Sequence, residues 1–113
     1  MNIAVIGLGL IGGSLAKSIK RHTDHRVFGY DLVPSVVLRA KVVQAIDQEL
    51  TDADLGSIDL FILALYPQAV IDYLREHARN MRPGTIVMDT CGIKGKVCHP
   101  AQSLCRQIGR AHV

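Results

Sequence analysis

Apolar residues are distributed along this chain in two alternating patterns. The first is a short continuous run rich in aliphatic and β-branched residues, which is typical of a buried strand. It occurs at residues 2–7, 26–31, 58–65 and 85–89. The second is a longer segment in which apolar residues recur every three or four positions, which predicts an amphipathic helix. It occurs at residues 11–20, 34–43, 67–80 and 96–107.

The order of these elements indicates the fold class. Strands that alternate with helices form right-handed βαβ units, in which a mainly parallel sheet carries helices on both faces. The polar segment 45–57 leaves room for at most a short third strand, and residues 108–113 resemble the beginning of another strand. We expect one α/β domain over residues 1–113. Because a domain rarely ends within a strand, we also expect the chain to be part of a longer protein.

The composition argues against several classes of function. Hydrophobic residues make up 49% of the chain and charged residues 20%, with a formal net charge of +3 and no block of like charge. Aromatic residues are only 4% and Trp is absent, so a surface that stacks nucleic-acid bases is not expected. No apolar run approaches the roughly 18 residues that a membrane span requires. We therefore expect neither a nucleic-acid partner nor a membrane partner.

The cysteines and histidines do not predict a metal site. The three cysteines are spaced seven apart, at 91, 98 and 105, which matches neither a disulfide framework nor a CxxC metal motif. We interpret them as reduced thiols of a cytoplasmic protein. The five histidines show no HxxH or HExxH spacing, and His77 is expected on the surface of its helix.

A glycine-rich turn follows the first predicted strand and opens the first predicted helix. Its GxGxxG places Gly7 in the tight turn, Gly9 where the backbone can approach a pyrophosphate, and Gly12 where helix and strand pack closely. The N–H groups and the positive end of the helix dipole then meet the phosphates. The pattern predicts a Rossmann-type, doubly wound domain. The loop residues predicted to contact the dinucleotide are Gly7, Leu8, Gly9, Leu10, Ile11 and Gly12.

Asp31 ends the second predicted strand, at the distance from the glycines that this motif requires. A carboxylate there can accept hydrogen bonds from both ribose hydroxyls of NAD and would repel the 2′-phosphate of NADP. The next residues, Leu32 and Val33, provide no arginine for such a phosphate. The sequence therefore favours NAD over NADP.

Nearly the whole chain resembles the cofactor domain of the prephenate dehydrogenase family, which includes arogenate dehydrogenases. The segments that carry the resemblance are IAVIGLGLIGGSLAKSIK, VFGYD, FILALYPQAVIDYL and RPGTIVMDTCGIKGKV. The resemblance implies NAD-dependent oxidation of prephenate, with release of carbon dioxide and 4-hydroxyphenylpyruvate, in tyrosine biosynthesis. It also implies a second, helical domain that is absent here and that carries homodimer contacts and part of the substrate site.

Further site residues follow the fourth and fifth predicted strands. Ala64, Leu65 and Tyr66 end the fourth strand at the carboxyl edge of the sheet, where the cofactor normally passes, although a plain strand end is the alternative. Cys91 either contacts the nicotinamide region through its backbone or is an inert small residue. Lys94 either faces the carboxylates of the substrate, orders the loop, or is a solvated lysine.

Two departures from the family pattern affect the expected chemistry. The catalytic histidine of the family belongs to a His-Pro motif, but His112 is followed by Val113 and no such motif is present. The catalytic base is therefore expected beyond Val113, and this chain alone should bind cofactor without turning over substrate. Gly92 stands where many members have a serine, which leaves prephenate and arogenate both open.

Two other functions fit parts of the sequence. One is another NAD-linked dehydrogenase of the 6-phosphogluconate or hydroxyacid type, whose cofactor domain has the same layout. The other is a non-enzymatic, nucleotide-sensing Rossmann module such as those that gate potassium transporters. The second gives no reason for the DTCGIKGK segment at 89–96.

Overall fold

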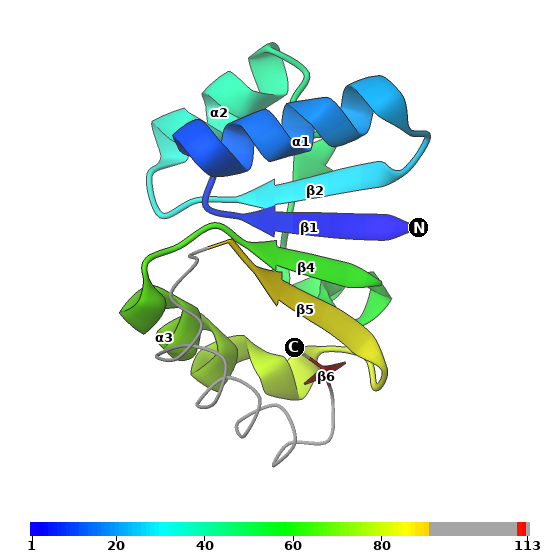
Figure 1. Cartoon of the computed structure of the whole chain (residues 1–113), viewed down its shortest axis with the longest axis vertical. Helices are drawn as coiled ribbons and strands as arrows, with labels where there is room; N and C mark the ends of the chain where they lie inside the picture. The colour runs from blue at the N-terminus through cyan, green and yellow to red at the C-terminus, as the bar shows by residue number, and fades with distance from the viewer. Residues whose placement is uncertain (91–110, 113) are drawn as a thin grey trace.

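The computed structural model describes residues 1–90 and 111–112, and a parallel sheet forms their centre (Figure 1). Its strand order is β3-β2-β1-β4-β5-β6, and every neighbouring pair in the described sheet is parallel. The strands are β1 (Asn2–Ile6), β2 (Arg26–Tyr30), β3 (Gln48–Glu49), β4 (Leu60–Leu63), β5 (Thr85–Asp89) and β6 (Ala111–His112). The predicted Rossmann-type fold is confirmed.

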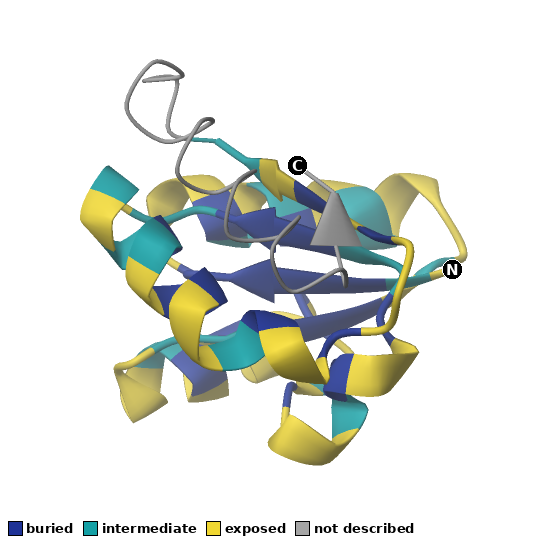
Figure 2. Cartoon of the chain, turned by 90° about the horizontal axis from the view of Figure 1, so that it is seen from below, coloured by how far each residue is buried: buried dark blue, intermediate teal, exposed yellow. Residues whose placement is uncertain are grey.

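Helices cover both faces of the sheet. The helices α1 (Leu10–His22) and α2 (Pro34–Val42) lie on one face, and α3 (Pro67–His77) lies on the other (Figures 1 and 2). Two 3₁₀ turns, η1 (Asp52–Ser57) and η2 (Ala78–Asn80), belong to the α3 side. Proline occupies the first position of α2 and of α3, where its fixed φ suits a helix and its missing N–H costs no intrahelical bond.

Alternation along the central strand divides the core into two layers. Ile3 and Val5 of β1 join the cluster beneath α1 and α2, whereas Ala4 and Ile6 join the cluster beneath α3. Successive side chains of a strand point to opposite faces, so a strand buried on both faces is apolar throughout. This is why the strands could be recognised as continuous apolar runs.

Several element boundaries differ from those expected. The strand β4 ends at Leu63 rather than at residue 65, and Leu65 and Tyr66 already lead into α3. Ala64 donates one further hydrogen bond to the Ile6 carbonyl, at 2.8 Å. The third helix ends at His77 and continues to Asn80 only as a 3₁₀ turn. The predicted helix over 96–107 lies outside the described residues.

The connection from β3 to β4 shapes the α3 side of the sheet. A long helix is usual in such a crossover, but η1 is a single short 3₁₀ element, Asp52–Ser57. Its start is fixed by a capping box, in which Thr51 and Asp54 bond each other's backbone N–H. Because this element is short, the sheet face between it and α3 is left open as a cleft.

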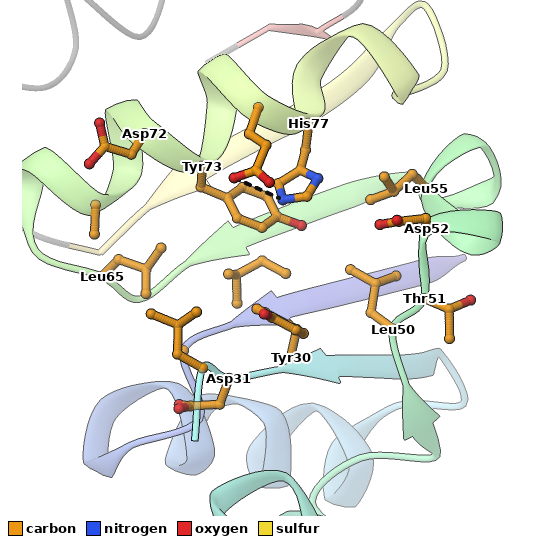
Figure 3. A pocket seen from close by; sticks show the side chains of 15 residues that line it. Tyr30, Asp31, Leu50, Thr51, Asp52, Leu55, Leu65, Asp72, Tyr73 and His77 are labelled. Atoms are coloured by element: carbon orange, nitrogen blue, oxygen red, sulfur yellow. Dashed lines mark ion pairs between the residues drawn. The ribbon is translucent and has the colours of Figure 1, made fainter. Parts of the chain in front are cut away.

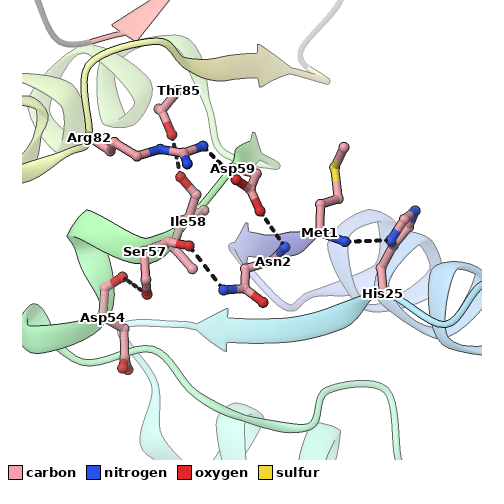
Figure 4. Close-up of polar contacts among 9 residues, drawn as sticks. All are labelled: Met1, Asn2, His25, Asp54, Ser57, Ile58, Asp59, Arg82 and Thr85. Carbon is pink, nitrogen blue, oxygen red and sulfur yellow. Dashed lines mark hydrogen bonds and ion pairs between the residues drawn. The ribbon is translucent and has the colours of Figure 1, made fainter.

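Asp59 ties together three strands at the amino edge of the sheet (Figure 4). Its Oδ2 accepts the backbone N–H of Asn2 at 2.7 Å, and its Oδ1 pairs with the Arg82 guanidinium. The Asn2 N–H and Arg82 hold the pKa of Asp59 below its ordinary value, although partial burial acts in the opposite direction. This carboxylate therefore works in its charged form to join β1, β4 and the segment before β5.

Asp47 makes a similar connection beside β2 and β3. Its Oδ2 accepts the Val27 N–H at 2.7 Å, and its Oδ1 lies 2.6 Å from the Lys20 ammonium of α1. Burial alone would raise the pKa of Asp47, but the hydrogen bonds from Lys20 and Val27 outweigh it, and the pKa lies below its ordinary value.

Candidate cofactor site

The turn between β1 and α1 has the geometry that the glycine motif predicts. Gly7 has a φ of +90°, a conformation that favours glycine, and its N–H donates to the Tyr30 carbonyl at 2.8 Å. A Cβ on Gly7 would lie 2.4 Å from the Ala64 carbonyl oxygen, and a Cβ on Gly12 would lie 1.7 Å from the Gly7 carbonyl oxygen. The tight turn and the close helix–strand packing are therefore confirmed.

Gly9 differs from these two glycines because a Cβ there would meet no atom within 4 Å. It precedes α1, and the exposed fractions of Leu10 and Ile11 are 89% and 61%. The first N–H groups of a helix have no intrahelical partner, and the first turn of α1 contains no acidic residue. The open space at Gly9 thus lies beside unshielded donors and the positive end of a helix dipole.

Asp31 lies just beyond β2 and faces this turn. Its Oδ2 accepts the Leu8 N–H at 2.8 Å, and its Oδ1 accepts the Val33 N–H at 2.9 Å. These bonds fix the plane of the carboxylate and leave each oxygen a further lone pair. The Leu8 side chain is buried in the core, so its N–H positions the acid rather than facing the solvent.

A cleft of about 660 Å³ extends from this turn across the sheet edge to α3 (Figure 3). Its floor is apolar and is formed largely by Ile6, Leu50, Leu55 and Leu65. Its walls carry four carboxylates and, among the described residues, no lysine or arginine. The carboxylates belong to Asp31, Asp52, Asp72 and Glu76.

Tyr73 and His77 of α3 form the inner wall of the cleft, and the sequence did not reveal either role. Their ring centroids are 4.3 Å apart with the planes tilted by 40°, and the His77 side chain is only 21% exposed. The expectation that His77 lies on the helix surface is therefore wrong, because the ring packs against Tyr73. Their spacing of one helical turn was the available signal, since residues four apart on a helix are neighbours.

The structure brings most of the predicted site residues together. Leu65 lines the cleft, and the Ala64 carbonyl oxygen lies against Gly7, where it leaves no room for a Cβ. Tyr66 is 86% exposed and does not line the cleft. Cys91, Gly92 and Lys94 lie outside the described residues, so their expected roles remain predictions.

The described part of the chain lacks two further features, a cluster of metal-ligating side chains and a membrane-spanning helix. Residues 1–90 and 111–112 contain no group of three His, Cys, Asp or Glu side chains that could hold a metal ion. Within the same ranges, no helix has the length and apolar character needed to cross a membrane.

The fold matches that of known proteins. The structure is similar to Synechocystis arogenate dehydrogenase, with a TM-score of 0.85 and 30% identity over 92% of this chain and 37% of that one. It is also similar to Aquifex aeolicus prephenate dehydrogenase in complex with hydroxyphenyl propionate and NAD+, with a TM-score of 0.86 and 23% identity over 98% of this chain and 40% of that one. Mycobacterium tuberculosis 3-hydroxyisobutyrate dehydrogenase, at 20% identity and a TM-score of 0.85 over 98% of this chain and 38% of that one, shares the fold.

The chain thus spans about two fifths of the length of these solved structures. A family description, the nucleotide-binding domain of prephenate dehydrogenase, matches residues 15–112. This match covers most of the chain, from α1 to β6. The chain therefore belongs to the prephenate dehydrogenase nucleotide-binding domain family.

Proposed function

We propose that this chain binds NAD as the cofactor-binding part of a prephenate dehydrogenase. The observation that carries the proposal is the combination of a glycine turn, with an open backbone at Gly9, and a fixed carboxylate at Asp31, because Gly7 of that turn and Asp31 line the same cleft. The turn suits a dinucleotide, since a pyrophosphate needs close backbone approach and free N–H donors.

Each part of the site has a role in this proposal. The N–H groups at the start of α1 bind the pyrophosphate, and the remaining lone pairs of Asp31 accept hydrogen bonds from the 2′ and 3′ hydroxyls of the adenosine ribose. A 2′-phosphate would meet the Asp31 carboxylate in a cleft whose described walls carry no lysine or arginine. NAD is therefore preferred over NADP.

The proposed reaction of the whole enzyme is the oxidative decarboxylation of prephenate to 4-hydroxyphenylpyruvate. Bound NAD would supply the hydride acceptor, and loss of the carboxylate would make the ring aromatic. The task of the described residues is to hold the cofactor in place. Arogenate is the second candidate substrate, because the arogenate dehydrogenase of Synechocystis is 30% identical over 92% of the chain. Comparing kcat/KM for the two substrates in the full-length enzyme distinguishes them.

The remaining parts of the proposal follow from the family. The substrate is a small molecule, the base and much of the substrate site belong to a further domain, and that domain joins two copies in a cytoplasmic homodimer. This chain alone is then expected to bind cofactor and to form no NADH from prephenate. Production of NADH from prephenate by the 113-residue chain would contradict the proposal that the catalytic base belongs to a further domain.

Cofactor titration tests the central proposal. NADH and NADPH are titrated into the chain and binding is followed by nicotinamide fluorescence. NADH should bind at least about tenfold more tightly, which corresponds to about 1.4 kcal/mol. Asp31→Asn should reduce that ratio, whereas Asp24→Asn, which removes an exposed carboxylate outside the cleft, should not change it. Equal binding of the two cofactors by the unaltered chain would overturn the assignment of NAD.

A further inference from the structure

The inner end of the cleft contains a polar group without a protein partner. Tyr73 lines the cleft and is only 9% exposed, yet no group in residues 1–90 or 111–112 forms a hydrogen bond with its hydroxyl. The hydroxyl points away from α3 into the space between that helix and the Leu50–Asp52 segment (Figure 3). The side chain is largely buried, but its oxygen is open to the cleft, because none of the buried side-chain polar atoms of the described residues lacks a hydrogen-bond partner. The hydroxyl is therefore placed to meet a ligand that enters the cleft.

The surroundings of the hydroxyl keep it a hydrogen-bond donor. Burial raises the pKa of the Tyr73 phenol, with smaller contributions from Tyr30, Asp52 and Glu76, so the group stays protonated at neutral pH. The ring itself is held by its contact with His77. The phenol therefore has a fixed position and can both donate and accept.

Two carboxylates flank this position from opposite walls. Asp52 begins η1, and Glu76 lies on α3 one turn beyond Asp72. Ionised carboxylates accept hydrogen bonds and cannot donate them. The inner end of the cleft therefore combines an apolar floor, one phenol, the His77 ring and two exposed acceptor groups, of which Glu76 lies 3.9 Å from His77 Nε2.

We propose that Tyr73, Asp52 and Glu76 form a subsite that selects a 6-aminopurine over a 6-oxopurine. This inference rests on the proposed binding of NAD and identifies the groups that read its adenine. The flat base lies on the apolar floor, the phenol donates to a ring nitrogen, and the carboxylates accept from the 6-amino group. A 6-oxo group would place an oxygen lone pair against these carboxylates, with no proton between them.

Nicotinamide hypoxanthine dinucleotide provides the test, because it differs from NAD only in having a 6-oxo group on the purine. Both dinucleotides are titrated into the 113-residue chain by calorimetry. The unaltered chain should bind NAD about tenfold more tightly, the effect of one hydrogen bond to a charged group. The double variant Asp52→Asn/Glu76→Gln should bind the two nearly equally, because an amide can donate to the 6-oxo oxygen.

Two further variants separate the contribution of the Tyr73 phenol from that of the carboxylates. Tyr73→Phe should weaken both dinucleotides by about threefold to tenfold and leave their ratio unchanged, because the phenol can either donate or accept. Glu49→Gln removes an exposed carboxylate outside the cleft and should change neither affinity. Circular dichroism and thermal unfolding verify that each variant is folded.

The outcomes distinguish this inference from the proposed function. Equal affinity for the two dinucleotides in the unaltered chain overturns the purine subsite and leaves the NAD site standing. A preference for NAD that survives in the double variant likewise overturns the role of the two carboxylates. Failure of NAD to bind at all overturns both proposals.

Discussion

Asp59 and Asp31 lie at opposite edges of the sheet and use the same side chain in different ways. Asp59, at the amino edge, accepts the Asn2 N–H and pairs with Arg82. Asp31, at the carboxyl edge, accepts the N–H groups of Leu8 and Val33 and pairs with no cation of the described chain. The first carboxylate therefore has its charge compensated within the protein, whereas the second keeps an uncompensated charge beside a cleft.

The same contrast holds for the two edges as a whole. The amino edge is closed by hydrogen bonds among Asn2, Ser57, Asp59 and Arg82. The carboxyl edge instead presents a glycine turn, an open helix start and a cleft. Ligands of open α/β sheets bind at the carboxyl ends of the strands, so the amino edge is free to serve stability alone.

The largest expected effect is a loss of stability that distinguishes two glycines of the turn, Gly12, which is closely packed, and Gly9, which has open space beside it. Gly12→Ala places a Cβ 1.7 Å from the Gly7 carbonyl oxygen, so the backbone must move. We expect a loss of about 3 kcal/mol or more in the free energy of unfolding, at the upper end for overpacking. Gly9→Ala, where nothing lies within 4 Å, should retain the fold and weaken NADH binding. Urea denaturation and cofactor titration measure the two effects, and equal stability of the two variants would contradict this distinction.

The next effect concerns the amino edge. Asp59→Ala leaves the Asn2 N–H and Arg82 without their acceptor and should cost about 2 kcal/mol of unfolding free energy. NADH affinity should be unchanged, because Asp59 lies at the edge away from the cleft. Asp24→Ala serves as the exposed control in the same urea denaturation experiment. A large loss of NADH affinity in folded Asp59→Ala would show that the two edges are coupled.

A smaller effect appears as a pH dependence. Asp59 and Asp47 both have pKa values below the ordinary 3.8 in the folded protein. Their contribution to stability is therefore complete above the ordinary pKa and is lost as the pH falls through the lower folded-state pKa. The midpoint of urea unfolding is measured between about pH 6 and pH 2. As the pH is lowered, this midpoint should fall less steeply in Asp59→Asn than in the unaltered chain. An identical slope would contradict the role of the Asp59 charge.

The smallest expected effect on stability is at the cofactor edge. Asp31→Asn retains one acceptor oxygen and loses no ion pair of the described chain, so it should cost at most about 1 kcal/mol. Its principal effect should be the change in NADH preference over NADPH. If urea denaturation showed a larger loss than for Asp59→Ala, the contrast between the two carboxylates would be wrong.

The features predicted correctly from the sequence are those set by neighbouring residues. The strands β1, β2, β4 and β5 are continuous apolar runs, and the Gly7–Gly12 turn is specified by its own spacing. The inner cleft wall could not be predicted in this way. Tyr73 and His77 face the Leu50–Asp52 segment only because a short 3₁₀ element replaces a crossover helix.

The ion pair between Asp59 and Arg82 could not be predicted from the sequence, for the same reason. These residues are 23 positions apart, and no local pattern in the sequence links one to the other. Parallel strands bring such distant positions to one edge, but the strand order must be known before the pair can be identified. Local pattern therefore predicts the elements and the glycine turn, and topology decides which side chains meet.

Gly29, in the middle of β2, has a consequence for how this domain can change during evolution. A Cβ at this position would lie 2.7 Å from Ile46 Cγ2 and 2.9 Å from Leu8 Cδ1. Leu8 in turn belongs to the glycine turn and donates its N–H to Asp31. Among related sequences, a larger residue at position 29 should therefore occur together with smaller residues at positions 8 or 46. The shape of the glycine turn is in this way linked to a strand position that lies inside the core.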